Sequence, residues 1–517
     1  MHKLLRKMKK NFASSAGDLS NDGHQTNDMQ ISATDIYRYR KQRGVNLGSW
    51  FVLERWISDT PFRNAKAPAQ SDLDVAHGSN AQEILEQHWD TWIQESDWDW
   101  IARHGINSVR IPIGYYHLCG ADPSVLHATD FQPFHDVYSG AWSRIVRAIQ
   151  SAAARNIGVL IDLHAAPGKQ NNDSHAGTSD RANFFGDVHN QNCTLRVLKS
   201  LIQTLTRLLQ ESNPPLNNII GIELLNEPHP PSDHALQKWY TEAISTIHEL
   251  DSSIPIYIGD CWRLDIYADF ISHHASSGPL VLDHHLYRCF TSSDIHTSVQ
   301  DLSRSLADHS ASFPQTLKRA AEKIGRAGGG VVIGEWSGAL NPGSLRGVPG
   351  EQREYVDAQL GLYEKVCAGW FFWTYTKEHG GDTGWSFRDA VDGGVFPELA
   401  GPQRNYVDNS EGGVARRNRA LEESKRQAFG AHIDYWSRIS GSYNHPLFES
   451  GFEAGWNDAY TFMLSTPSLS PSVIQLGFTG AWARKRSSDH SKHYWEFEHG
   501  FMQGVDAANA HYQAAEN

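Results

Sequence analysis

Two glutamates stand where buried strands are expected to end. Glu227 follows the apolar run IIGIELLN, and Glu335 follows GGVVIG. A buried carboxylate is costly unless it is paired or used in chemistry, and a lone glutamate at such a place is more often a surface or salt-bridge residue. Glutamates after a fourth and a seventh strand, however, would face each other across one barrel mouth. A separation of about 5 Å suits glycoside cleavage by double displacement, in which one carboxyl protonates the leaving oxygen and the other attacks the anomeric carbon.

Polar side chains also follow other predicted strands. Asn226 is placed to hydrogen-bond a sugar 2-hydroxyl, and Arg110 is placed to fix an ionised carboxylate and lower its pKa. Tyr287 is a candidate second donor to the same carboxylate. His164 and His285 could contact sugar hydroxyls or tune the acid, although a single histidine is usually a structural core residue. The sequence predicts no metal binding by this pair, since no third ligand has suitable spacing.

Composition narrows the class of partner. The chain has 17 tryptophans, and indole faces suit the apolar faces of sugars, although core packing explains most of them. Trp373, at the end of the last predicted strand, could form a platform beneath a sugar ring. The formal net charge of −13 argues against nucleic acid as a partner. Five scattered cysteines without a CxxC pair indicate neither a zinc site nor a disulfide framework, so we expect no metal and no cofactor.

An alternation of strands and helices is expected to position these side chains. Short apolar runs predict eight strands, at 43–45, 107–111, 158–163, 219–225, 256–258, 281–285, 331–334 and 369–373. Helical periodicity lies between most of them, for example at 81–103, 141–156, 195–210, 234–250, 314–324 and 351–366. This order predicts the α/β class and a closed (β/α)8 TIM barrel. A doubly wound sheet is the main alternative, but it would carry a glycine fingerprint after its first strand, which residues 44–48 do not match.

Three regions are expected along the chain. The sequence predicts a disordered basic and polar tail at residues 1–33, the catalytic barrel at residues 34–407 and a mainly helical extension at residues 408–517. The extension begins with a charged helical segment at 415–436. It then repeats FExGFxxG, at 448–455 and 497–504, with phenylalanine and glycine on one helical face. Glycine inside a helix costs about 1 kcal/mol relative to alanine, so we expect two closely packed helices, either face to face or on the barrel. A stabilising cap is the favoured role, and a partner-docking module is the alternative.

The N-terminal residues indicate in which cellular compartment the protein is expected. Its first ten residues carry Lys3, Arg6, Lys7, Lys9 and Lys10 but no apolar core of the kind that a secretory signal peptide needs. We also see no stretch of about 20 apolar residues that could span a membrane. These features predict a cytoplasmic protein, with organelle targeting by the basic start as the alternative.

Seven segments together resemble glycoside hydrolase family five, and in particular its fungal exo-β-1,3-glucanase (glucan 1,3-β-glucosidase) branch. The segments are RGVNLGSWFVLE (43–54), VRIPIGYY (109–116), DLHAAPGKQN (162–171), LLNEP (224–228), DHHLYRCF (283–290), GEWSGAL (334–340) and FWTYT (372–376). The resemblance implies that Glu227 is the acid/base and Glu335 the nucleophile. It also implies sugar-contacting or supporting roles for Glu54, Arg110, His164, Asn226, His285, Tyr287 and Trp373.

Two departures from the family pattern concern the rim of the cleft and the cysteines. Secreted relatives carry a pair of phenylalanines that hold the next glucose unit. Phe290 resembles one of them, but Asp173 stands near the position of the other. The cysteines that secreted relatives carry after GEWS and near the end of the barrel are absent. The first change leaves the leaving group undetermined, and the second agrees with an intracellular enzyme.

Three functional hypotheses follow. The first is a retaining β-glycosidase that releases glucose from the non-reducing end of a β-glucan oligosaccharide. The second is a β-glucosidase for small lipid, sterol or aryl glucosides. The third is a non-catalytic sugar-binding or scaffold protein that docks partners through the extension, which the intact carboxylate pair argues against.

Overall fold

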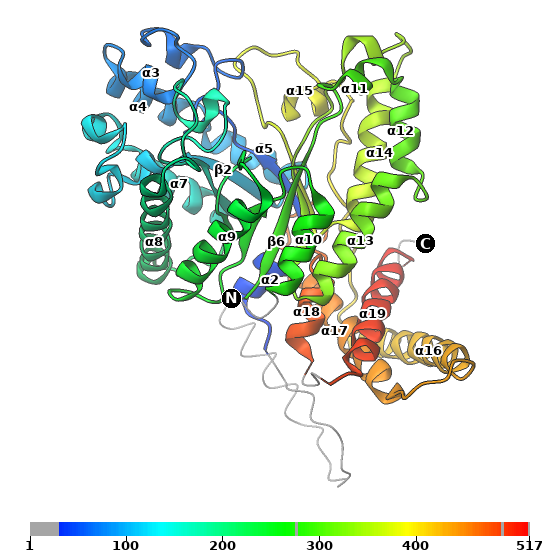
Figure 1. Ribbon diagram of the computed structural model, residues 1–517. Helices are drawn as coiled ribbons and strands as arrows, with labels where there is room; N and C mark the ends of the chain where they lie inside the picture. Colours follow the sequence, from blue (N-terminus) through cyan, green and yellow to red (C-terminus); the bar gives the residue numbers. More distant parts are fainter. Residues whose placement is uncertain (1–29, 275–277, 488–490, 515–517) are drawn as a thin grey trace.

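Eight parallel strands form a closed barrel in chain order (Figure 1). The computed structural model describes residues 30–274, 278–487 and 491–514. The strands are β1 Gln42–Asn46, β2 Ser108–Gly114, β3 Gly158–Ala165, β4 Ile219–Glu223, β5 Ile256–Gly259, β6 Leu280–Leu286, β7 Gly330–Trp336 and β8 Gly369–Phe372. Each overlaps one of the predicted apolar runs. The predicted (β/α)8 barrel is therefore confirmed.

The strands are buried on both faces, which explains why they appear in the sequence as continuous apolar runs. One apolar cluster joins side chains of six strands, namely Leu160, Ile220, Tyr257, Val281, Val332 and Phe371. Gly44 makes room for the ring of Phe371, because a Cβ at this position would lie 2.2 Å from that ring. Phe478 of the C-terminal extension belongs to the same cluster, so the extension helps to close one end of the barrel.

Helices surround the barrel (Figure 1). They include α4 Ala81–Thr91, α5 Glu95–Arg103, α7 Ala141–Ala154, α8 Val188–Glu211, α9 Asp233–His248, α10 Leu264–His273, α12 Val299–Ala307, α13 Ser312–Arg326 and α14 Glu351–Val366. The single predicted helix over 81–103 is wrong, since it is divided into α4 and α5. The backbone N–H of Gln94 donates to Asp97 Oδ2 at 2.8 Å and thereby caps a new helix.

A short N-terminal helix, α2 Ala33–Tyr39, packs beside β4 and α18 Thr479–Arg486. A capping box formed by Ser32 and Asp35 begins this helix. The guanidinium of Arg40, buried just after it, donates to the backbone carbonyls of Asn107 and Asn156. Most of the predicted tail lies outside the described residues.

The C-terminal extension is helical and has an apolar core of its own. Its long helices are α16 Glu411–Trp436, α17 His445–Leu464 and α19 Tyr494–Ala514. The two copies of FExGFxxG lie on α17 and α19, which pack against each other. The contact is reciprocal: a Cβ on Gly451 would lie 2.1 Å from the Phe497 carbonyl oxygen, and one on Gly500 would lie 2.0 Å from that of Phe448. Both copies therefore need glycine because the backbones touch.

Two further predictions concern disulfides and membrane spans. All five cysteines are free thiols, and Cys119, Cys193 and Cys367 are buried. Among the described residues, we find no helix with both the length and the apolar character that a bilayer span requires.

Candidate active site

Glu227 and Glu335 meet at the C-terminal end of the barrel. Glu227 follows β4 after a short turn, and Glu335 is the penultimate residue of β7. One carboxylate oxygen of each, together with a ring nitrogen of His285, lies within 4.8 Å of the others. This separation fits a retaining mechanism, in which the two carboxyls are about 5 Å apart, and is too short for the wider gap of inverting enzymes.

The Glu335 carboxylate is held from both sides. Its Oε1 accepts from Arg110 Nη1 at 2.9 Å, and its Oε2 accepts from the Tyr287 hydroxyl at 2.7 Å. The Arg110 guanidinium is fully buried and is itself fixed by Glu223, at 2.7 Å, and Asp162, at 3.0 Å. Two fixed donors set the orientation of the carboxylate and favour its ionised form.

Glu227 has a different environment. Its Oε1 accepts from Nδ1 of His285 at 2.8 Å, and its Oε2 lies 3.8 Å from Nε2 of His175. Its backbone has a φ of 42°, in the left-handed region that non-glycine residues rarely adopt. The side chain of Asn171 supports this conformation by donating to the Glu227 carbonyl oxygen at 3.0 Å. Strain held in place by neighbouring contacts is frequent at functional sites.

Protons in this site are shared among Glu227, His285 and Glu335. Burial raises the pKa of Glu335 to about 7, while the charges of His285 and Arg110 act to lower it. Burial acts in the same direction on Glu227, but the hydrogen bond and charge of His285, together with the electrostatic influence of His175 and His164, outweigh it and bring the pKa of Glu227 to about 2. Although burial opposes it, the neighbouring carboxylates raise the pKa of His285 well above its ordinary value. The transferable proton of the free protein therefore resides on His285, against Glu227, and the three groups titrate together.

Asn226 and His164 form an ordered pair beside the carboxylates. His164 Nδ1 donates to Asp162 Oδ2 at 2.6 Å, which leaves Nε2 unprotonated and facing the Asn226 amide nitrogen at 3.3 Å. Burial lowers the pKa of His164 and keeps its ring neutral. The Asn226 amide oxygen accepts from Arg110 at 2.8 Å, which fixes the amide nitrogen toward His164. One of its two N–H groups then donates to His164, and the other remains for a ligand. The Trp373 ring lies parallel to that of His164, with centroids 5.8 Å apart.

The rim of the site is aromatic on one side. Glu54 is buried and accepts from the Trp56 indole N–H at 2.7 Å, and burial raises the pKa of Glu54 to about 8. The Trp385 ring lies 5.3 Å from that of Trp56, between ring centroids, and 5.2 Å from that of Tyr287. Phe290 is 68% exposed and packs with its ring 5.9 Å from Trp385. These side chains form a surface that suits the face of a sugar.

Comparison with known proteins identifies the family. Residues 75–379 match the family described as cellulase (glycosyl hydrolase family 5). The chain belongs to glycosyl hydrolase family 5. Residues 417–512 match the family described as the glucan 1,3-beta-glucosidase 3 C-terminal domain. The predicted membership is thus confirmed, and the protein is a glycoside hydrolase.

Full-length relatives share both parts of this family 5 enzyme. It is 33% identical to glucan 1,3-beta-glucosidase 3 of Schizosaccharomyces pombe, over 91% of this chain and 96% of the relative. It is 29% identical to an uncharacterised glycosyl hydrolase of Saccharomyces cerevisiae, over 93% of each chain. Among solved structures, rutinosidase from Aspergillus niger is similar with a TM-score of 0.56 and 20% identity, over 69% of this chain and 98% of that one. That last likeness concerns the fold alone.

All ten site residues predicted from the sequence of this glycoside hydrolase lie at the same end of the barrel, in the contacts given above. Sequence reasoning missed the buried acids that surround Arg110, namely Asp162, Glu223 and Asp283. Each interrupts an apolar run, and that interruption was the available signal. It also missed His175, and the rim residues Trp56 and Trp385, which lie in loops without periodicity.

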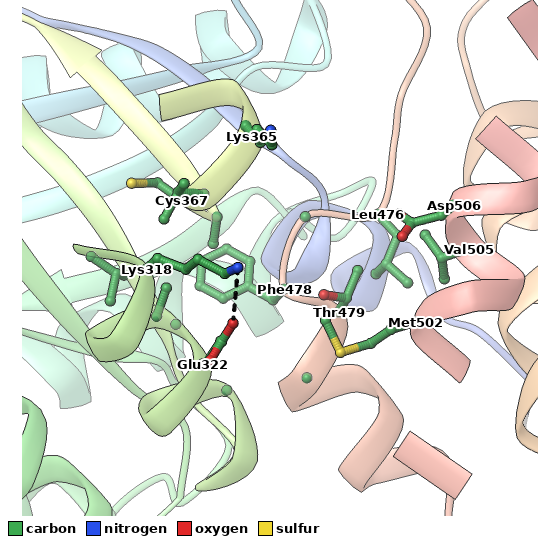
Figure 2. A pocket seen from close by; sticks show the side chains of 18 of the residues that line it. Lys318, Glu322, Lys365, Cys367, Leu476, Phe478, Thr479, Met502, Val505 and Asp506 are labelled. Atoms are coloured by element: carbon green, nitrogen blue, oxygen red, sulfur yellow. Dashed lines mark ion pairs between the residues drawn. The ribbon is translucent and has the colours of Figure 1, made fainter. Parts of the chain in front are cut away.

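A large cleft of this family 5 enzyme lies apart from the active site. It has a volume of about 930 Å³ and lies between the barrel and the C-terminal extension (Figure 2). Lys318 and Cys367 line one side, Met502 and Asp506 line the other, and Phe478 also borders the cleft. Val331, at the start of β7, also borders it, which places the cleft at the opposite end of the barrel from Glu335.

Proposed function

We propose that this glycoside hydrolase is a retaining exo-β-glucosidase with Glu227 as acid/base and Glu335 as nucleophile. The observation that carries the assignment is the contrast between the two carboxylates. Glu335 is fixed by Arg110 and Tyr287, which suits an ionised nucleophile with one defined direction of attack. Glu227 accepts one strong hydrogen bond, from a protonated His285, and so has a proton beside it to deliver.

The first step forms a covalent sugar ester. A Glu335 oxygen attacks the anomeric carbon while the bond to the leaving oxygen breaks. His285 supplies a proton to Glu227, which passes it to that leaving oxygen, and the alcohol departs while Glu227 is left ionised and His285 neutral. In the second step, Glu227 takes a proton from water, whose oxygen attacks the same carbon and releases Glu335. Two inversions at one carbon retain the β configuration.

Neighbouring side chains would bind the sugar that occupies the site. The remaining amide N–H of Asn226 is available to the 2-hydroxyl, where hydrogen bonds strengthen as charge develops at the anomeric carbon. Trp373 offers an apolar face, and the Glu54 carboxyl offers a hydrogen-bonding group for another hydroxyl. A glucose ring, with every hydroxyl equatorial, combines apolar faces with polar edges in the way that this set requires.

The proposed substrate is a β-1,3-glucan oligosaccharide, attacked at its non-reducing end. The name of the full-length relative from Schizosaccharomyces pombe supports this choice, as does the aromatic rim of Phe290 and Trp385. One observation favours small lipid, sterol or aryl glucosides as a second candidate. The opposite rim carries Asp173 and His175, whose side chains approach to 3.9 Å, so the second sugar has a polar wall there instead of a ring.

A variant series would test the assignment of roles. Glu335→Gln should abolish turnover of a nitrophenyl β-glucoside, whereas Glu211→Gln, an exposed glutamate at the end of α8, should leave it unchanged. Azide should restore turnover to Glu335→Gly and give the α-glucosyl azide. An active Glu335→Gln protein would refute the role of the nucleophile. Comparison of laminari-oligosaccharides with glucosylated lipids and sterols would decide between the two substrate classes.

We also propose a cytoplasmic location and a capping role for the extension. Five cysteine thiols favour a reducing compartment. Phe478 joins the apolar cluster inside the barrel, which favours a cap over a module that only docks partners. Fractionation of cells that express the full chain would test the location. Truncation near residue 440 would test the cap: a soluble and fully active product would refute it.

A further inference from the structure

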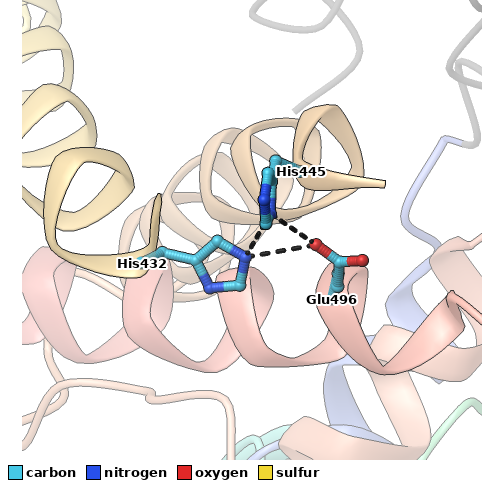
Figure 3. A group of neighbouring side chains, drawn as sticks. All are labelled: His432, His445 and Glu496. Atoms are coloured by element: carbon cyan, nitrogen blue, oxygen red, sulfur yellow. Dashed lines mark hydrogen bonds and ion pairs between the residues drawn. The ribbon is translucent and has the colours of Figure 1, made fainter. Parts of the chain in front are cut away.

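Three side chains from three helices of the C-terminal extension converge away from the catalytic site (Figure 3). His432 lies near the end of α16, His445 is the first residue of α17, and Glu496 lies in the first turn of α19. His432 Nε2 and His445 Nδ1 are 3.2 Å apart, and they lie 3.2 and 3.0 Å from Glu496 Oε2. Three potential ligand atoms thus form a nearly equilateral triangle.

Hydrogen bonding alone accounts poorly for this triangle. If both ring nitrogens carry protons, two N–H groups converge on one oxygen while their nitrogens lie 3.2 Å apart. If one nitrogen is unprotonated, its lone pair faces the Glu496 carboxylate at close range. Both arrangements are unfavourable where His432 and Glu496 are almost completely buried. A cation resolves the conflict, because all three atoms can then direct a lone pair toward it.

We propose that His432, His445 and Glu496 form a binding site for a divalent transition metal, for which Zn²⁺ is the best match. Zinc binds imidazole nitrogen and carboxylate oxygen at about 2.0–2.2 Å, so the ligand atoms of a tetrahedral site lie about 3.4 Å apart. The observed distances of 3.0–3.2 Å need only a slight expansion. The His445 side chain is 27% exposed, which provides a path for entry and room for water as the fourth ligand.

The surroundings fit a site that holds an ion. The second oxygen of Glu496 accepts from the backbone N–H of Asn444, which fixes the carboxylate with Oε2 toward the histidines. His432 stacks on Phe448, with ring centroids 4.2 Å apart, and Trp436 packs on Trp495 at 4.7 Å. An apolar shell of this kind limits solvent around the ligands. Phe448 belongs to the first FExGFxxG copy, so the proposed ion would join α16 to the paired helices.

A structural function follows from this placement. The ligands lie on the N-terminal turns of α17 and α19 and near the C-terminal end of α16, so one ion would link three helix ends. Since the ion binds the folded extension better than the unfolded chain, it would stabilise that region. The site lies outside the barrel, and the proposed chemistry of Glu227 and Glu335 does not depend on it.

The experiment uses the full chain, stripped with EDTA and dialysed, and titrates it with ZnSO₄ and then with CoCl₂. Elemental analysis should find about one zinc per chain, and Co²⁺ should give the intense visible absorption of a tetrahedral site. His445→Ala should weaken zinc binding at least ~100-fold through loss of a ligand. The matched control is His499→Ala, an exposed histidine of α19 whose ring lies 5.7 Å from that of His432 but outside the triangle.

Stability provides the second readout. Zinc should raise the melting temperature of the wild-type protein and of the His499→Ala variant, and leave that of His445→Ala unchanged. Glu496→Gln, checked for native circular dichroism, repeats the test if His445→Ala does not fold. Equal zinc binding by the wild type and His445→Ala, or no tetrahedral Co²⁺ spectrum in the wild type, would overturn the proposal and leave a hydrogen-bonded triad.

Discussion

Nδ1 of His285 lies 2.8 Å from Glu227 Oε1 and 3.5 Å from Glu335 Oε2, so one imidazole serves both carboxylates. Its position makes the free enzyme a three-group acid in which the proton rests on the ring. A sugar that enters the site removes water from these groups and favours neutral partners, so the proton can move to Glu227, where the leaving oxygen needs it.

His285→Gln should therefore impair acid catalysis selectively. We expect kcat to fall by about 10²–10³-fold for a glucoside with a poor leaving group, which is the usual contribution of general acid catalysis. A dinitrophenyl glucoside, whose leaving group needs no proton, should lose far less. The alkaline limb of kcat/KM should move to lower pH. The pKa of His285 is raised well above its ordinary value, so the imidazole holds its proton at high pH, and the variant lacks this proton source. Equal losses on both substrates would assign His285 a merely structural role.

The buried acids around Arg110 make the stability of the enzyme depend on pH. Burial raises the pKa of Glu223 to about 8, from an unfolded value near 4.3. A raised pKa in the folded state contributes stability that is present below the unfolded pKa and is lost as pH rises through the folded pKa. The free energy of unfolding should therefore decrease as pH rises from about 4 to about 8, because Glu223 must ionise in the folded protein.

Glu223→Gln tests this dependence, because it keeps the shape and removes the titration. Urea unfolding of the variant should show a weaker decline between pH 4 and pH 8 than the wild type, with a difference on the order of 3 kcal/mol. Glu211→Gln, at an exposed position, serves as the control. Parallel pH profiles for wild type and Glu223→Gln would contradict the prediction.

The sequence predicts the barrel and the two catalytic candidates well, for a physical reason. Strands buried on both faces must be apolar, so the polar residues that follow them, such as Glu227 and Glu335, stand out. Asp162 and Glu223 were harder to interpret, since they lie within the runs, and strand periodicity does not reveal that the barrel interior is polar at their level. His432 and His445 are 13 residues apart, and Glu496 is 51 residues further than His445. Helix packing alone brings these three together, so no spacing motif exists.

The glycines of the FExGFxxG repeat offer a direct test of how the extension is held together. Gly500→Ala should destabilise the extension by about 2 kcal/mol or more, because the new Cβ would meet the Phe448 carbonyl oxygen at 2.0 Å and force α17 and α19 apart. Gly430→Ala, in α16 with nothing within 4 Å of the new Cβ, should stabilise it by up to about 1 kcal/mol. Thermal unfolding monitored by circular dichroism would compare them. Similar effects of both substitutions would mean that the close contact is unimportant.

The aromatic rim should determine how well the enzyme holds a second sugar. Phe290→Ala removes a ring that is 68% exposed and that touches none of the groups proposed to do the chemistry except Tyr287, at a ring distance of 5.8 Å. We expect KM for laminaritriose to rise about 5–10-fold, as the loss of one stacking contact of about 1 kcal/mol implies, with kcat nearly unchanged. KM for a nitrophenyl glucoside should change less. Asp173→Phe should act in the opposite direction, because it supplies a ring on the polar side of the rim. If neither substitution changes the ratio of the two KM values, the second sugar does not bind between these residues, and small glucosides become the better substrate class.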